Sequence, residues 1–235
     1  MKKSLSFDLN HPLNPFWLVF VLAAFLVSCS NYSPDANNKV CLVPDRTCLH
    51  GKAIVEIKTN RGIILLEVDG DSSPVTAGNF LDLIDKGVYE QTLFHRVIKI
   101  PTPFVLQGGD PSSRDPKTPK IKYGKGSFID PVSGQARFIP LEIKLKGEKS
   151  PRYNQLITNP KDLLDLQLRH QRGSIAMARS QRLDSASSQF YFALKPLPEL
   201  DGRYSIFGRI IEGIDILNNI QEGDLILKTQ ILLNR

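Results

Sequence analysis

Polar side chains interrupt two apolar runs of the sequence. Arg96 lies in the strand-like run from Phe94 to Ile98, and Gln107 comes near the end of a run that begins at Phe104. A buried strand face normally excludes such groups. An arginine guanidinium is permanently charged, planar and able to donate several hydrogen bonds. Arg96 is therefore either a fixed hydrogen-bond donor beside an apolar pocket or a surface ion-pair residue on an alternating strand.

A second pair of runs carries Ala178 with Arg179, and then Gln189 with Tyr191. Serines lie near Asp184 between these runs, but no Gly-x-Ser-x-Gly turn is present, so we discount a hydrolase. The four histidines are scattered, and none lies at ligand spacing from a cysteine. We expect no metal site and no cofactor.

Together with the segment from Leu200 to Gly208, these runs resemble the signature segments of the cyclophilin-type peptidyl-prolyl cis-trans isomerases. The resemblance implies catalysis of rotation about X-Pro bonds, which crosses a barrier of about 18–20 kcal/mol. No covalent bond needs to break. Such a site needs a donor near the prolyl nitrogen and an apolar pocket for the pyrrolidine ring, and it must bind the twisted amide more tightly than the planar one.

The resemblance also assigns roles to individual residues. It implies that the catalytic residues are Arg96, Gln107 and Phe104, and that the substrate-binding residues are Val105, Ala178, Arg179, Gln189, Tyr191, Leu200 and Tyr204. Arg179 stands where many eukaryotic members have asparagine, and Tyr204 stands where some members have histidine. On composition alone, each apolar or aromatic residue of this set would be read as a core residue.

One departure from the family pattern lies beside the predicted pocket. Residues 99–103 form a link three residues longer than is usual. We expect the extra residues to bulge the loop, with a shift of Phe104 as the consequence to examine. His95 is interpreted as structural, because strand alternation places it on the face opposite Phe94.

Short strands dominate the chain from residue 51 onward. Residues 53–59 and 63–68 predict a β-hairpin around a turn. A helix is predicted between Ser73 and Gly87, and a shorter one across 213–220. Further strands are predicted at 93–98, 173–178, 189–194, 205–211 and 226–233. This pattern favours a mainly β fold, and the resemblance implies a closed eight-stranded antiparallel β-barrel capped by two α-helices.

The net charge of +6 is concentrated in residues 111–172, which hold thirteen Lys and Arg against six Asp and Glu, and seven of the sixteen prolines. We interpret this stretch as an elaborated basic surface region, because no aromatic-interleaved RNA-binding motif accompanies it. Its longest predicted element is a capped helix from Asn159 to Arg169. The composition is that of an ordinary globular protein, and residues 51–235 are predicted to form one domain.

Residues 1–28 have the pattern of a bacterial signal peptide, with an apolar run at 16–27 that is too short to span a bilayer. The sequence Leu-Val-Ser-Cys ending at Cys29 resembles the lipobox of bacterial lipoproteins, whose cysteine is acylated. The alternative is an ordinary signal peptide with a chance cysteine. Residues 29–50 then contain the lipidated cysteine and a tether, in which Cys41 and Cys48 form either a disulfide or two free thiols.

These features predict an isomerase that accelerates folding of exported proteins. We expect it to be lipid-anchored to a bacterial cell-envelope membrane, with its domain facing the periplasm or an equivalent lumen. The expected partners are proline-containing polypeptides and the membrane, without nucleic acid, and we expect a monomer. The alternative is a cyclophilin-fold chaperone or peptide-binding module with little turnover. Arg96 and Gln107 favour the enzyme, whereas the insertion at 99–103 favours the module.

Overall fold

The computed structural model describes residues 47–234. The predicted signal peptide, Cys29 and Cys41 lie outside the described residues. Cys48 is disulfide-bonded. Among the residues that the structure describes, no helix combines the length and the apolar character needed to cross a membrane.

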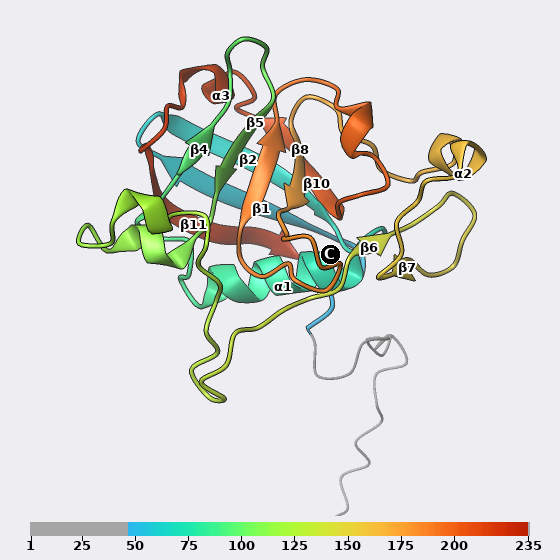
Figure 1. The fold of residues 1–235 in the computed structure, drawn as a ribbon, viewed down its shortest axis with the longest axis horizontal. Coiled ribbons are helices and arrows are strands. Elements are labelled where there is room, and N and C mark those ends of the chain that lie inside the picture. The colour runs from blue at the N-terminus through green and yellow to red at the C-terminus, as the bar shows by residue number, and fades with distance from the viewer. Residues whose placement is uncertain (1–46, 235) are drawn as a thin grey trace, which may run out of the picture. The chain divides into compact units, whose positions relative to one another are not determined.

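A curled antiparallel sheet forms the centre of the described part of the chain (Figure 1). Its nine strands follow the order β3-β11-β1-β2-β10-β8-β9-β5-β4. Their bounds are β1 Lys52–Thr59, β2 Gly62–Asp69, β3 Thr92–Leu93, β4 Arg96–Val97, β5 Val105–Gly108, β8 Ser174–Met177, β9 Phe190–Ala193, β10 Ile206–Glu212 and β11 Leu225–Asn234. A separate two-stranded ladder pairs β6, Glu142–Ile143, with β7, Arg152–Tyr153.

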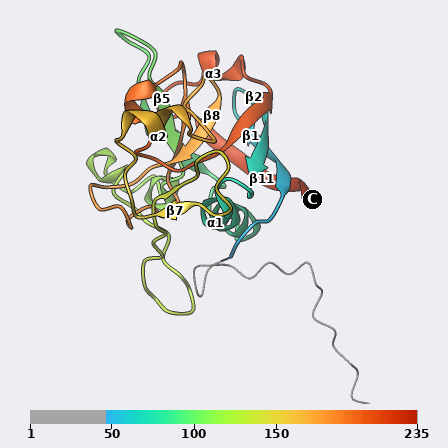
Figure 2. The same ribbon diagram turned by 90° about the vertical axis from the view of Figure 1, so that its right-hand side faces the viewer.

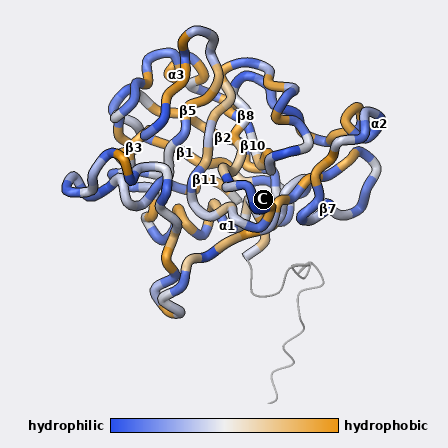
Figure 3. Tube along the Cα trace, viewed as in Figure 1, coloured by the Kyte–Doolittle hydropathy of each residue, from blue (hydrophilic) through white to orange (hydrophobic). Residues whose placement is uncertain are grey.

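The helices are short except for the first. They are α1 Pro74–Asp85, α2 Pro160–Leu164 and α3 Ile216–Asn219, with 3-10 turns at Pro111–Arg114, Lys120–Lys122 and Pro198–Leu200. α1 and α3 lie at opposite ends of the curled sheet in both views, as expected for the two capping helices (Figure 1, Figure 2). Apolar residues gather along the strands, whereas apolar and polar residues are mixed in the segments around α2 and β7 (Figure 3).

The closed eight-stranded barrel is not what the hydrogen bonds show. β3 and β4 are the two edges of a nine-stranded open half-barrel, and only Phe94 and His95 separate them in the chain. The Phe94 N–H donates to the carbonyl of Asp224 at 2.8 Å, and its carbonyl accepts from Gly223 at 2.9 Å. The strand predicted at 93–98 is therefore broken, because Phe94 is bonded to the loop before β11.

The predicted hairpin and first helix are confirmed. β1 and β2 pair along their full lengths. α1 begins at Pro74, and Gly87 follows its end with a φ of +63°, which glycine adopts without strain. The ring of Phe80 packs edge to face on Phe190 of β9, with centroids 5.6 Å apart. The apolar face of α1 thus covers the inner face of the sheet.

The helix predicted from Asn159 to Arg169 is shorter than expected. Asn159 caps α2 as predicted, because its side chain accepts a bond from the Lys161 N–H at 2.9 Å. α2 nevertheless ends at Leu164, because the next residues pair with another segment: Leu166 forms a β-bridge with Leu145 and is buried in a small apolar cluster. Burial of Leu166 replaces the continuation of the helix.

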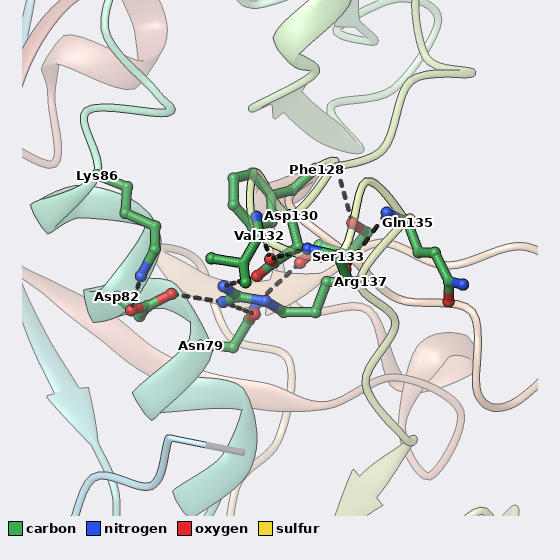
Figure 4. Close-up of polar contacts among 10 residues, drawn as sticks. Asn79, Asp82, Lys86, Phe128, Asp130, Val132, Ser133, Gln135 and Arg137 are labelled. Atoms are coloured by element: carbon green, nitrogen blue, oxygen red, sulfur yellow. Dashed lines mark hydrogen bonds and ion pairs between the residues drawn. The ribbon is translucent and has the colours of Figure 1, made fainter. Parts of the chain in front are cut away.

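Most lysines of residues 111–172 are exposed, but a charged side chain of this region forms hydrogen bonds and an ion pair with α1. Arg137 lies between α1 and the loop 128–136, which precedes Arg137 in the sequence (Figure 4). Its guanidinium donates to Asp82 and, at 3.3 Å, to Asn79 of α1, and it also reaches Asp130 at 3.4 Å. The same guanidinium lies 4.6 Å from the centroid of the Phe128 ring. Arg137 therefore connects the segment around residues 128–137 to α1.

A buried carboxylate from the same region caps α1. Glu142 of β6 is 1% exposed, and its two oxygens accept from the N–H groups of Val75 and Thr76 at 3.2 and 2.9 Å. Ser73, the predicted N-cap, instead donates its hydroxyl to the carbonyl of Ile206 at 2.8 Å. Burial raises the pKa of Glu142, while the bonds from α1 pull this pKa down. The first N–H groups of a helix favour such an acceptor.

We expect Glu142→Ala to lower the free energy of unfolding by roughly 2–3 kcal/mol, because it leaves two buried N–H groups of α1 without an acceptor. Urea unfolding measures this change. The control is Glu148→Ala, which removes the partly exposed ion pair with Arg152 at 2.8 Å and is expected to cost less than about 1 kcal/mol. Equal losses in the two variants would contradict the capping role.

Candidate active site

Strand alternation places the predicted site residues on the outer face of the sheet. In β5, Leu106 belongs to the main core, whereas its neighbour Val105 belongs to a second apolar cluster. In β9, Phe190 and Phe192 point into the core, and Tyr191 between them points to the second cluster. Side chains of successive strand residues alternate between faces, so one set builds the core and the other builds the site.

The second cluster, called the outer cluster below, collects the apolar and aromatic residues predicted to contact substrate. It consists of Val105, Ala176, Tyr191, Ala193, Leu197 and Ile206, with Phe104, Leu168, Ala178, Leu200 and Tyr204 packed against it. The Tyr204 ring meets the Tyr191 ring edge to face at 5.7 Å. All six predicted apolar and aromatic site residues therefore lie together.

Three of the four predicted polar residues form a row of hydrogen bonds along three strands or strand ends. Arg96 of β4 lies opposite Gln107 of β5 and donates to its side-chain oxygen at 3.3 Å. Gln107 in turn donates to the side-chain oxygen of Gln189 at 2.9 Å, and Gln189 donates to the carbonyl of Gly126 at 2.7 Å. Each amide is thereby oriented by its neighbours. The guanidinium of Arg96 is exposed and keeps further N–H groups for another acceptor.

A cavity of about 470 Å³ opens beside this row. It is lined by Gln107, Lys125, Ala178, Arg179 and Gln189, among others. Arg179 donates to the carbonyls of Arg203 and Ser180 at 2.7 and 2.8 Å and lies over the Tyr204 ring. Arg182 at the rim is paired with Asp184 at 3.0 Å. Lys125 and Arg179 have no carboxylate partner among the described residues, so the wall of the cavity is cationic.

The arrangement of the site agrees with the comparison to known protein families. The family model described as cyclophilin type peptidyl-prolyl cis-trans isomerase/CLD matches residues 54–232. The chain belongs to the cyclophilin family. The match covers the outer cluster and the whole row of polar residues.

Two curated relatives show how widely the resemblance extends. A Synechocystis protein that carries the name of a thylakoid lumen peptidyl-prolyl cis-trans isomerase is 37% identical over 78% of this chain and 48% of its own length. The chain thus spans about half of that relative. A peptidyl-prolyl cis-trans isomerase of Helicobacter pylori is 35% identical over 74% of this chain and 83% of its own length.

A solved cyclophilin type isomerase of Cryptosporidium parvum, determined in the presence of the dipeptide Ala-Pro, has a similar fold. The TM-score is 0.55 at 28% sequence identity, and the match covers 77% of this chain and 99% of that chain. The curled sheet of this cyclophilin is therefore shared with a structurally characterised member of the family.

The inserted loop of this cyclophilin is closed at its base and projects from the sheet. The Phe104 N–H donates to the carbonyl of Ile98 at 2.9 Å, which closes the loop 99–103 at its base. Lys99 donates to two carbonyls at the end of α3, each at 2.6 Å. The loop bulges outward as expected, with Ile100 87% exposed. Phe104, which follows the loop directly, packs against the outer cluster.

His95 takes no part in the row of polar residues. Its two ring nitrogens are buried and have no hydrogen-bond partner in the described part of the chain. Burial lowers the pKa of His95, which favours the neutral ring. The interpretation of His95 as structural stays a prediction.

Sequence reasoning missed two residues that contact the pocket. His170 Nε2 lies 2.8 Å from the hydroxyl of Tyr191, and His170 Nδ1 lies 2.7 Å from Asp201 Oδ1. His170 belongs to the region that we had interpreted as a surface elaboration, and Asp201 lies next to the predicted pocket residue Leu200. Their separation of 31 residues matches no motif, so only the fold brings them together.

The cationic cavity wall predicts a preference for peptides in which X, the residue that directly precedes the proline, is acidic. We expect peptides with Glu there to bind about two- to fivefold more tightly than matched Gln peptides, because screened charge pairs contribute up to about 1 kcal/mol; calorimetry measures the two affinities. Arg179→Gln should remove most of this preference, and added salt should weaken it. The control is Arg209→Gln on β10, which is paired with Glu67. Equal affinities for both peptides in the wild-type protein contradict the expectation.

Proposed function

We propose that this cyclophilin catalyses cis-trans isomerisation of X-Pro bonds in polypeptides. The observation that carries the proposal is the position of the Arg96–Gln107–Gln189 row beside the outer cluster. The two are joined within the sheet, because Gln107 pairs with Tyr191 across β5 and β9. A charged donor thus borders an apolar surface.

The chemistry requires only that the twisted amide be bound better than the planar one. As the amide twists, conjugation is lost and the lone pair localises on the prolyl nitrogen, where it can accept a hydrogen bond. Arg96 is positioned to donate that bond, and Gln107 orients its guanidinium at 3.3 Å. Phe104, Tyr191 and Leu200 would hold the pyrrolidine ring while the preceding carbonyl rotates.

The family and its named members support this proposal. The relatives in Synechocystis and Helicobacter pylori carry isomerase names. The Cryptosporidium structure was determined with Ala-Pro, the smallest segment that contains an X-Pro bond. We propose the same substrate class, proline-containing polypeptides, for this chain, acting as a monomer and without nucleic acid.

A second candidate function is a peptide-binding chaperone with little turnover. The exposed loop 99–103 favours it, because Ile100 adds apolar surface beside the site without adding a catalytic group. A protein of this kind would bind Pro-containing peptides and leave their isomerisation rate unchanged.

We expect Arg96→Ala to lower kcat/KM on a proline tetrapeptide at least about tenfold, equivalent to roughly 1.4 kcal/mol of barrier. A protease-coupled assay measures the rate. Arg209→Ala, a change of the same type on β10, serves as the control and should keep wild-type activity. Full activity of Arg96→Ala would rule out the assigned mechanism, whereas an inactive wild-type protein that binds the peptide would identify the chaperone.

We also propose that the domain at 51–235 is exported and lipid-anchored through Cys29, with the remainder of 29–50 as a tether. The support is the apolar run at 16–27 followed by Leu-Val-Ser-Cys, and the lumenal name of the Synechocystis relative. The disulfide at Cys48 fits an oxidising compartment, in which structural disulfides persist. In this proposal Cys41 is its partner.

Expression in a bacterium with a lipoprotein pathway tests the anchor. We expect the wild-type chain in the membrane fraction and Cys29→Ser in the soluble exported fraction, because the acyl chains are lost with the thiol. Cys41→Ser, which leaves the acylated position intact, should remain with the membrane. Retention of Cys29→Ser in the membrane fraction would contradict the proposal.

A further inference from the structure

A buried chain of hydrogen bonds lies behind the outer cluster. The side chain of His170 is fully buried, and that of Asp201 is 10% exposed. The imidazole lies between the Asp201 carboxylate, 2.7 Å from Nδ1, and the Tyr191 hydroxyl, 2.8 Å from Nε2. In the described part of the chain, His170 and Asp201 make no hydrogen bond to Arg96, Gln107 or Gln189, and the proposed mechanism uses neither of them.

The partners fix the direction of the hydrogen bonds. A carboxylate oxygen only accepts, so the proton of the neutral His170 ring lies on Nδ1. Nε2 is then an acceptor, and the Tyr191 hydroxyl donates to it. Burial raises the pKa of Tyr191 well above its ordinary value, which keeps the phenol protonated as a donor.

The backbone of His170 organises the other wall of the pocket. Its N–H donates to Asp201 Oδ1 at 2.8 Å, and its carbonyl accepts from the Leu197 N–H at 3.1 Å. Leu200 lies in the short turn between these two attachment points and packs against the outer cluster. One residue therefore holds both Tyr191 and the turn that carries Leu200.

We infer that His170 is a positioning residue of the prolyl pocket: its buried ring, bonded to Asp201 on one side, holds the Tyr191 ring through the Tyr191 hydroxyl. The inference rests on the proposed function, in which Tyr191 contacts the proline ring. Without the hydrogen bond of its hydroxyl, the Tyr191 ring would be held by packing alone and could tilt within the pocket. The bond to His170 restrains it, and the Tyr191 ring also stays nearly parallel to the imidazole, with an interplanar angle of 2°.

Two substitutions of His170 distinguish the hydrogen bond to Tyr191 from the hydrogen bond to Asp201. In His170→Gln, the side-chain oxygen can replace Nε2 as the acceptor for Tyr191, but the ring bond to Asp201 is lost. In His170→Asn, the side-chain nitrogen can replace Nδ1 as the donor to Asp201, but the acceptor for Tyr191 is lost. The two variants differ by one methylene group.

We expect His170→Asn to lower kcat/KM on a proline tetrapeptide about fivefold, which corresponds to roughly 1 kcal/mol at 25 °C, while His170→Gln stays within about twofold of wild type. Melting temperatures are measured for both variants, and the rates are compared well below them. If both variants are destabilised but catalyse at the wild-type rate, His170 is only structural and the inference is overturned. Equal losses of activity in the two variants overturn it as well.

The variant Tyr191→Phe completes the test, because it keeps the ring and removes the hydroxyl. Since the effect of His170 passes through that hydroxyl, His170→Asn should change kcat/KM by less than about twofold in the Tyr191→Phe background. Persistence of the fivefold effect in that background would overturn the inference.

Binding of the same tetrapeptide, measured by calorimetry, separates this inference from the proposed function. If the wild-type protein binds the peptide without turnover, the isomerase function fails. The order of affinities among the variants then decides the inference. Weaker binding by His170→Asn than by His170→Gln supports it, and equal binding by both overturns it.

Discussion

The site depends on the alternation of side chains along β5, β8 and β9. Each of these strands sends one set of residues into the core under α1 and the other set outward, so that Leu106 and Val105, or Phe192 and Tyr191, are neighbours in sequence and lie on opposite faces. A shift of register by one residue would exchange the two sets. Packing of the core therefore fixes the position of the outer cluster. The pairing of β5 with β4 and β9 also aligns Arg96, Gln107 and Gln189.

Features that depend on local sequence could be predicted, and features that depend on distant contacts could not. The β1–β2 hairpin, α1 and the cap at Asn159 follow from turn and cap residues close in sequence. The resemblance to a family located six of the eleven residues of the outer cluster. The early end of α2 depends on the pairing of Leu166 with Leu145, and the break at Phe94 depends on residues far along the chain. Neither leaves a periodic signal in its own segment.

In residues 111–172, contacts with distant residues were again not predictable from the local sequence. The charge and proline content of this region indicate an exposed elaboration, and many of its lysines are exposed. Yet Glu142 caps α1, Arg137 binds Asp82, and His170 supports Tyr191. The composition of a long segment does not reveal such residues, because a few buried groups scarcely alter its net charge. The region thus contributes to both the stability of the helix and the geometry of the pocket.

The pairing of β1 with β11 has a consequence for how the chain acquires its structure. Strands from the two ends of the described sequence lie side by side, and Gln230 donates to Glu56 across 174 residues. Such a sheet has a high contact order, because a long loop must close before the pairing contributes any stability. β11 also lies between β1 and β3. A nascent chain that lacks its last segment would leave β1 as an unpaired edge open to association with other chains, so folding of the sheet can finish only after synthesis of the C-terminal strand.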